Sequence, residues 1–392
     1  MIIEPKIRGF LCTTTHPIGC QAAVEEQIAL VRKRGAIPNG SRKALIIGCS
    51  AGYGLSSRVV AAFGCGAGTL GVSFERPAER GRTASPGWYQ NRAFDAAAAK
   101  AGLYSKTLNG DAFANDMKEE VVRTLKQDLA PIDLFIYSLA SPRRTHPVTG
   151  ITYRSTLKPV GKPYTNKTLD VNTGVVSDLT LEAATPEEVE NTVQVMGGED
   201  WEMWVDLLMK EKLLAPGAVT LAYSYIGPAV TQPVYRNGTI GAAKDHLEAT
   251  ADRLETKLKP LGGHAHISVN KGLVTQASSA IPYIPLYISV LYQVMKEKGT
   301  HEGTIEQMDR MFRERVYAGG PIVVDEHRFI RMDDWEMQED VQAAVRKFWE
   351  TVTTENLRSK SDGNGYRDDF LRLYGFNIAG VDYSADVPDD LI

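Results

Sequence analysis

A regular alternation of short apolar runs and helical patterns between residues 43 and 140 most constrains the fold of this chain. Strands that take turns with helices form parallel βαβ units with right-handed crossovers. The strands are predicted at Lys43–Ile47, Thr69–Phe74, Tyr104–Leu108 and Ile132–Tyr137, and the helices at Leu55–Phe63, Phe94–Gly102 and Asp111–Leu129. The sequence therefore predicts an α/β fold with a doubly wound, Rossmann-like parallel sheet.

The alternation pauses after residue 140 and resumes near residue 216. The interruption is rich in proline, threonine and glycine, and Thr185 with Glu188 predicts a capping box. We expect hairpin strands at 151–157 and 175–181, helices at 200–214 and 241–258, strands at 218–225 and 266–269, and a mostly helical remainder. These patterns predict one elaborated dinucleotide-binding domain over 1–392, with an inserted substrate-side segment at 141–216, extended termini, and helical substrate-pocket and C-terminal additions over 276–392.

Composition narrows the classes of protein to which the chain can belong. The formal net charge of −4 argues against nucleic acid as a partner, because phosphate binding needs a concentrated basic surface. The four cysteines form no C-x-x-C pair, which favours a reducing compartment. We expect a cytoplasmic protein, because we find neither a signal peptide nor an apolar run of about 18 residues that could span a membrane. We also expect a monomer, although the sequence gives no argument for the oligomeric state.

The histidines give little support for a metal centre. His264 and His266 form the only close pair, and on a strand they would share a face. We find no third residue at a zinc-binding spacing, so we expect no metal site.

A glycine-rich turn follows the first predicted strand of the alternating region and opens the next helix. Glycines let a backbone turn tightly beside a pyrophosphate, and the helix N-terminus offers free N–H groups. The spacing G-x-x-x-G-x-G differs from the commoner G-x-G-x-x-G fingerprint, so a tight turn without a ligand is an alternative. The cofactor-binding residues expected here are Gly48, Cys49, Ser50, Ala51, Gly52, Tyr53 and Gly54.

Two acidic residues follow the next two strands. Glu75, next to Phe74, lies where a carboxylate bonds the adenine ribose hydroxyls and repels a 2′-phosphate, so we expect NADH as the cofactor. The alternative interpretation of Glu75 is a solvated residue at the end of a strand. Asp111, next to Ala112, is placed either to accept from the adenine amino group or to cap the following helix. After the fourth strand, Leu139 and Ala140 lie in a loop of small residues suited to the nicotinamide ribose, or in an ordinary tight loop.

Two tyrosines and a lysine are the candidate chemical groups. Tyr225 and Tyr235 are ten positions apart, and Lys244 follows nine positions later. A phenol near an ammonium is a proton donor that ionises more easily, and a second phenol can hold an oxygen that gains negative charge. Nine helical steps would place Tyr235 and Lys244 on opposite faces. Either Tyr235 lies before the regular helix, or the two residues do not act together. We expect Tyr235 in a turn or an irregular first turn, with Lys244 on the regular helix that follows.

The Tyr-x8-Lys spacing and the G-C-S-x-G-Y-G turn resemble those of the FabV-type enoyl-[acyl-carrier-protein] reductases and the related trans-2-enoyl-CoA reductases, distant relatives of the short-chain dehydrogenases/reductases. The segments that carry this resemblance cover essentially the whole chain: HPIGC at 16–20, GVSFERP at 71–77, IYSLASPRRTHPVTG at 136–150, VMGGEDWEMW at 195–204, LAYSYIGP at 221–228, SVNKGLVTQAS at 268–278 and IPLYISVLYQVMKEKG at 284–299.

The resemblance implies NADH-dependent reduction of the 2,3-trans double bond of an enoyl thioester, carried by coenzyme A or a carrier protein, in fatty acid biosynthesis. It implies Tyr235 as the proton donor, Tyr225 as the contact to the thioester carbonyl, and Lys244 as the ligand of the nicotinamide ribose that favours ionisation of the tyrosine. Leu273, Val274 and Thr275 would meet the carboxamide. Asp245 stands where the family often has a second lysine, so that position receives no role.

Two other functions remain as alternatives. A 3-oxoacyl thioester ketoreductase would use a serine before the tyrosine, and Ser224 precedes Tyr225. A non-catalytic dinucleotide sensor would bind the cofactor without turnover. The sequence does not decide whether coenzyme A or a carrier protein carries the substrate. Five basic residues would attract coenzyme A phosphates or an acidic carrier protein, or would form a solvated face. They are Arg143, Arg144, Lys158, Lys162 and Lys167.

Overall fold

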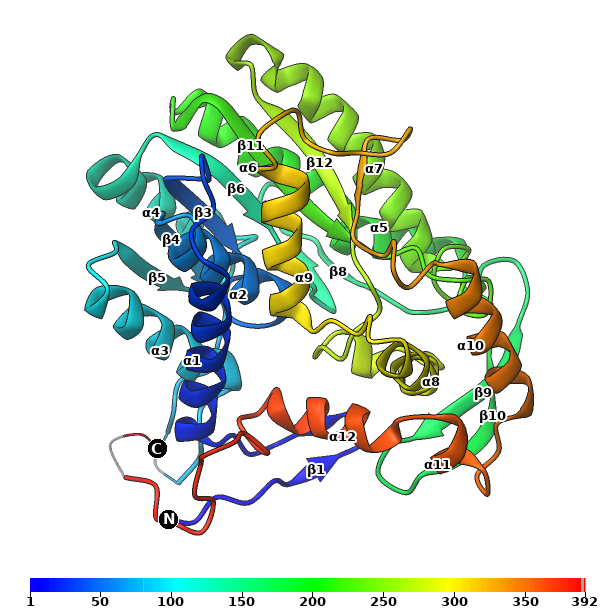
Figure 1. Ribbon diagram of the computed structural model, residues 1–392. Helices are drawn as coiled ribbons and strands as arrows, with labels where there is room; N and C mark the ends of the chain where they lie inside the picture. Colours follow the sequence, from blue (N-terminus) through cyan, green and yellow to red (C-terminus); the bar gives the residue numbers. More distant parts are fainter. Residues whose placement is uncertain (80, 389–390, 392) are drawn as a thin grey trace.

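Seven parallel strands form the central sheet of the computed structural model, in the order β13-β12-β11-β6-β3-β4-β5 (Figure 1). The structure describes residues 1–79, 81–388 and 391. The strands are β3 (Lys43–Ile47), β4 (Gly68–Ser73), β5 (Ser105–Asn109), β6 (Ile132–Tyr137), β11 (Leu214–Ser224), β12 (His264–Val269) and β13 (Phe329–Arg331). The order reverses between β3 and β6, which confirms the predicted doubly wound sheet.

Successive residues of each buried strand point to opposite faces, and both faces are covered by helices. Ala44 and Ile46 pack on one side of β3, whereas Leu45 and Ile47 pack on the other. The first face is covered by α1 (Pro17–Arg34), α2 (Gly52–Val59), α3 (Pro86–Lys100) and α9 (Thr304–Met311). The second is covered by α4 (Asn115–Thr124), α6 (Glu199–Lys210) and α7 (Thr239–Leu258).

Short π-helical turns extend three of these helices. They span Val60–Gly64 after α2, Leu125–Leu129 after α4 and Phe312–Val316 after α9. Within the described part of the chain, no helix combines the length and apolar character needed to cross a bilayer.

A second apolar core surrounds α8 (Ile284–Glu297), beyond one end of the sheet (Figure 1). Nine of the fourteen residues of this helix are apolar or aromatic and buried there, among them Leu286, Tyr287 and Leu291. The elements around it are α10 (Glu339–Thr351), α11 (Leu357–Lys360), α12 (Gly363–Arg372) and the hairpin of β9 (Tyr164–Asp170) with β10 (Val175–Leu181). This core unites segments far apart in the sequence.

The remaining elements are small. Strands β1 (Ile7–Arg8) and β2 (Leu11–Cys12) form one hairpin, and β7 (Arg143–Thr145) with β8 (Thr152–Arg154) another. Helix α5 (Pro186–Met196) begins at the predicted capping box, in which Thr185 and Glu188 bond each other's backbone N–H groups.

Some boundaries differ from those predicted. The helix expected at Asp111 begins at Asn115 with Ala114 as its N-cap, so the capping alternative for Asp111 is wrong. Strand β11 begins at Leu214, inside the range predicted as a helix. Strand β13 was missed because it is three residues long and lies at the sheet edge.

Arg58 fixes α2, the helix that follows the glycine turn, to the sheet. Its side chain is fully buried, and it donates to Thr69 Oγ1, Thr107 Oγ1, Ser105 Oγ, the Lys106 carbonyl and Asp95 Oδ1 at 2.7–3.1 Å. A single guanidinium therefore satisfies acceptors on β4, β5 and α3.

We expect Arg58→Met to lower the free energy of unfolding by about 3 kcal/mol, because removal of the guanidinium leaves the Asp95 carboxylate without its cation and several polar groups unpaired. Asp95 is partly exposed, which keeps the loss near the lower end of the usual range. Chemical denaturation of the chain measures it. Arg253→Met is the matched control, since Arg253 pairs with Glu202 at the surface and should cost less than about 1 kcal/mol. Equal losses for the two variants would contradict this account.

Candidate active site

The candidate site lies at the carboxyl ends of the strands, where the strand order reverses between β3 and β6. Gly48 directly follows β3, with a φ of 83°, and a Cβ there would stand 1.9 Å from the Ser138 carbonyl oxygen after β6. A side chain at this position would thus separate the two strand ends. The predicted glycine turn forms the floor of the crevice.

The start of α2 is suited to a pyrophosphate. The helix begins at Gly52, and its N-cap Ala51 supplies no side-chain bond to the first N–H groups. A Cβ on Gly52 would meet only Thr275 Cγ2, at 3.7 Å, so the backbone faces open space there. Cys49 contributes backbone alone, because its buried Sγ contacts Arg58 and Asn91. These residues fit the phosphates of a dinucleotide.

Polar groups gather beside this turn at the ends of β4 and β5. Glu75 accepts from Ser50 Oγ at 2.6 Å and from Ser85 Oγ at 2.5 Å. Its backbone N–H and carbonyl both bond the Asn109 side chain. The structure thus joins the predicted ribose ligand Glu75 directly to the glycine turn.

The neighbours of Glu75 differ in exposure. Phe74 is 71% exposed and presents a free aromatic surface, whereas Ala112 is buried. Asp111 accepts from the Phe113 N–H at 3.0 Å in a turn after β5. All three therefore lie near the strand ends, outside the lining of the cavity described next.

A cavity of about 190 Å³ continues the crevice toward α8. Besides Lys244, five of the residues predicted to bind the cofactor line this cavity. They are Tyr53, Leu139, Ala140, Leu273 and Thr275. Val274 is not among the lining residues and is buried in the core around α8. The α8 end is lined by Ile281, Ile284 and Ile288, so the cavity is polar at the sheet and apolar at α8.

The structure brings Tyr225 and Tyr235 together in this cavity. Tyr225 directly follows β11, and Tyr235 lies in a turn before α7, as predicted from its spacing to Lys244. Their ring centroids are 4.9 Å apart with an interplanar angle of 89°. Lys244, in the second turn of α7, lines the same cavity and donates to the Tyr223 carbonyl at 3.0 Å.

Burial dominates the electrostatics of the three groups. It raises the pKa of both phenols. The tyrosines are therefore protonated at neutral pH, as a proton donor requires. Burial lowers the pKa of Lys244 to about 8, although the Glu248 carboxylate acts in the opposite direction.

Several residues of the site were not singled out from the sequence. Tyr223, Asn270 and Lys271 line the cavity, and Tyr53 Oη donates to the Lys271 carbonyl at 2.7 Å. Glu336 contacts Tyr225 from a segment more than one hundred residues away. Position after a parallel strand would have indicated Asn270 and Lys271, whereas Glu336 required the tertiary structure.

The five basic residues considered for carrier binding separate into two groups. Arg144 is buried and paired with Glu199, Lys158 pairs with Glu188, and Lys167 donates to three carbonyls at the end of α10. Arg143 and Lys162 are exposed. Only the latter two present free charge to a carrier.

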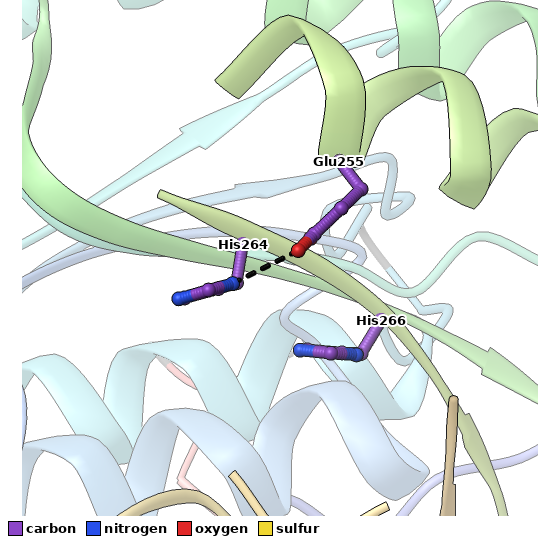
Figure 2. Close-up of side chains that lie close together, drawn as sticks. All are labelled: Glu255, His264 and His266. Carbon is purple, nitrogen blue, oxygen red and sulfur yellow. Dashed lines mark hydrogen bonds and ion pairs between the residues drawn. The ribbon is translucent and has the colours of Figure 1, made fainter. Parts of the chain in front are cut away.

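A second polar cluster lies on β12 (Figure 2). The rings of His264 and His266 are stacked on one face, as expected, and Glu255 of α7 bonds His264 Nδ1 at 3.0 Å. These three could together hold a metal ion. However, Glu255 Oε2 already accepts from the Ala265 N–H and pairs with Arg328 at 2.9 Å, so a cation would compete with the guanidinium. We infer that this cluster attaches β12 to α7. The expected lack of a metal site stays a prediction.

Three family descriptions match consecutive parts of the chain. Residues 2–80 match the NAD(P)H binding domain of trans-2-enoyl-CoA reductase. Residues 82–317 match the trans-2-enoyl-CoA reductase catalytic region. Residues 324–387 match an enoyl reductase FAD binding domain.

The third segment does not fit a flavin dinucleotide. Its glycines Gly363 and Gly365 begin α12, where the Asp362 carboxylate already accepts from the Gly365 N–H at 2.8 Å. The first turn of α10 contains Glu339 and Asp340. Both helix starts thus hold carboxylates that would repel a pyrophosphate, and we derive no step from a flavin.

Relatives with assigned names match over nearly their full length. The chain is 59% identical to the enoyl-[acyl-carrier-protein] reductase [NADH] of Flavobacterium johnsoniae, over 98% of this chain and 97% of the relative. It is also 59% identical to the enzyme of the same name from Opitutus terrae, over 99% and 98%. The crystal structure of Treponema denticola trans-2-enoyl-CoA reductase in complex with NAD has a TM-score of 0.96 and 52% identity, over 99% and 98% of the two chains. The chain therefore belongs to the trans-2-enoyl-CoA reductase family, together with these NADH-dependent enoyl-[acyl-carrier-protein] reductases.

Proposed function

We propose that this chain reduces the 2,3-trans double bond of an enoyl thioester with NADH, through Tyr225, Tyr235 and Lys244. Its family makes it an oxidoreductase of fatty acid biosynthesis with NADH as cofactor. The observation that carries the residue assignment is the meeting of the two phenols in one cavity with Lys244, beside the start of α2. That arrangement combines a proton donor, an oxygen-binding group and a dinucleotide crevice.

Each of the three residues has a separate task in the proposed reaction. Bound NADH would supply the hydride that adds to C3. Tyr225 donates to the thioester oxygen, which gains negative charge as C3 is reduced. Tyr235, protonated because it is buried, gives its proton to C2, directly or through the enol. Lys244 holds the nicotinamide ribose.

The position of the fatty acyl group follows from the cavity lining. Ile281, Ile284 and Ile288 form the apolar end, suited to an acyl chain, while the tyrosines lie at the sheet end. We propose that 141–216 and 276–392 are the substrate-side parts of one domain, since Met196 and α8 both line the cavity. We propose that the acyl group is carried by coenzyme A or by a carrier protein. We also propose that the protein is a cytoplasmic monomer.

We expect Tyr235→Phe to lower kcat with an enoyl thioester by about 10²–10⁴-fold, because the ring stays but the proton donor is lost. The NADH dissociation constant should stay within about threefold of that of the parent chain, since the phenol is assigned to the substrate. NADH oxidation with crotonyl-CoA and NADH fluorescence measure the two quantities.

The control for Tyr235→Phe is Tyr104→Phe, because Tyr104 bonds Asp128 outside the cavity and its loss should leave turnover unchanged. Near-normal turnover of Tyr235→Phe would refute the assignment. Ser224 lines the cavity, with no hydrogen-bond partner for its buried Oγ among the described residues. Faster NADH oxidation with a 3-oxoacyl thioester than with crotonyl-CoA would therefore establish a ketoreductase. NADH binding without turnover of either substrate would establish a dinucleotide sensor.

Replacement of Glu75 tests the choice between NADH and NADPH. Two unit charges about 4 Å apart repel by about 4 kcal/mol at an effective dielectric of 20, which is an upper limit for Glu75 and a 2′-phosphate. We expect Glu75→Gln to raise kcat/KM with NADPH by at least about tenfold relative to NADH. Glu79→Gln is the control on the same segment, because Glu79 is exposed. An unchanged cofactor preference in Glu75→Gln would remove Glu75 from this role.

Lys244 makes NADH binding dependent on pH. Because its pKa lies at about 8, the side chain is mainly an ammonium below that pH and loses its proton as the pH rises through it. We expect the NADH dissociation constant to increase above about pH 8 by several fold, as one charge on the ribose ligand is lost. Titration of the free enzyme with NADH at a series of pH values measures this.

The matched variants for Lys244 separate charge from shape. Lys244→Arg stays charged throughout and should bind NADH without the alkaline loss, whereas Lys244→Met should bind weakly at every pH. NADH binding that is flat across pH 8 in the parent chain would show that the ammonium is not needed.

A further inference from the structure

Glu336 is a buried carboxyl directly behind Tyr225. It lies between β13 and α10, its side chain is fully buried, and it is outside the cavity lining. Its Oε1 is 2.9 Å from Tyr225 Oη and 2.6 Å from Tyr287 Oη. Its Oε2 accepts from the Gly272 N–H at 2.6 Å. The carboxyl therefore links three segments to the phenol assigned to the substrate.

The donors around Glu336 leave one proton position undecided. The Gly272 N–H can only donate, so Oε2 is an acceptor. Tyr287 Oη receives an N–H from Gln342 at 3.3 Å and directs its own proton at Oε1. The contact between Oε1 and Tyr225 Oη holds one more proton, which belongs either to the phenol or to the carboxyl.

The position of that proton decides what Tyr225 can do. If Glu336 is ionised, the single O–H of Tyr225 is spent on it, and the phenol has no proton to offer a thioester oxygen. If Glu336 is neutral, its Oε1–H donates to Tyr225 Oη, and the Tyr225 O–H is free to point into the cavity. Whether Glu336 is ionised or neutral, each of its contacts pairs one donor with one acceptor, so the contacts permit the neutral form.

The surroundings favour the neutral form. Burial raises the pKa of Glu336 above its usual value, although the hydrogen bonds from Tyr287 and the Gly272 N–H and the charge of Lys271 lower it. The Asp333 carboxylate adds a smaller rise. The Lys271 ammonium donates to the Gly272 and Glu302 carbonyls at 3.4 Å and lies over the Tyr292 ring. Asp333 is paired with Arg331. The phenols of Tyr53, Tyr225 and Tyr287 are further titratable neighbours, and they are uncharged at neutral pH.

We propose that Glu336 is a positioning residue that acts as a neutral carboxylic acid, donates to Tyr225 Oη and so directs the Tyr225 O–H at the thioester oxygen. The chain of hydrogen bonds runs from Gln342 through Tyr287 and Glu336 to Tyr225, with each group donating to the next. The inference rests on the proposed role of Tyr225 as the oxygen-binding group. It requires no net proton transfer, so Glu336 stays neutral through the reaction.

Infrared difference spectroscopy of the whole chain tests the protonation state. We expect the carbonyl stretch of a protonated carboxylic acid at neutral pH in the parent chain, shifted in D₂O, lost in Glu336→Gln and displaced in Tyr225→Phe. Glu339→Gln, an exposed carboxyl on the same segment, should leave the band unchanged. If the parent chain shows only carboxylate bands at this site, the proposal is overturned. If Glu336→Gln fails to fold, a displaced carbonyl band in Tyr225→Phe still shows that the protonated carboxyl lies beside Tyr225.

A double-mutant cycle tests whether Glu336 acts through Tyr225. Glu336→Met removes the donor and should lower kcat about tenfold or more with little change in the NADH dissociation constant, while Glu336→Gln keeps an N–H donor and should stay within about threefold. In a Tyr225→Phe background, Glu336→Met should cost nothing further. An equal cost in both backgrounds would show a purely structural role. Unchanged turnover in Tyr225→Phe alone would instead refute the proposed function of that tyrosine.

Discussion

The contact between Gly48 and the Ser138 carbonyl determines where the rest of the site is placed. With no side chain at Gly48, β3 and β6 end side by side at the position where the strand order reverses. Helix α2 then leaves on one side of the crevice and supplies an uncapped N-terminus. On the other side β11 and α7 supply Tyr225 and Lys244. Cofactor phosphates and reactive side chains are thus brought together by the winding of a single sheet.

Burial sets the protonation states that the proposed chemistry needs. It is the largest influence on the pKa of Tyr225, Tyr235, Lys244 and Glu336, and it disfavours the charged form of each. Two phenols and a carboxyl are kept as hydrogen-bond donors, while the lysine titrates close to neutral pH. Neutral donors buried in this way stabilise a negative charge that develops on the substrate oxygen.

Local patterns predicted much of the fold, since hydrophobic periodicity reports which face of a strand or helix is buried. Strands β3 and β6 begin and end as predicted, and the turn at Tyr235 followed from its incompatible helical spacing to Lys244. Contacts between distant segments could not be predicted. The contact of Glu336 with Tyr225 and the ion pairs of Arg144 and Lys158 depend on tertiary packing.

The second core explains why the chemistry of a dinucleotide-binding sheet is directed at a fatty acyl group. The crevice of the sheet alone would place Tyr225 and Tyr235 at an open edge. Helix α8 closes that edge with isoleucines, and the segment between β13 and α10 that packs beside it carries Glu336 to the back of Tyr225. The same addition therefore supplies an apolar wall for the acyl chain and the carboxyl that orients the oxygen-binding phenol. A change in α8 should thus alter chain-length preference and the orientation of Tyr225 together, because Tyr287 of α8 bonds Glu336.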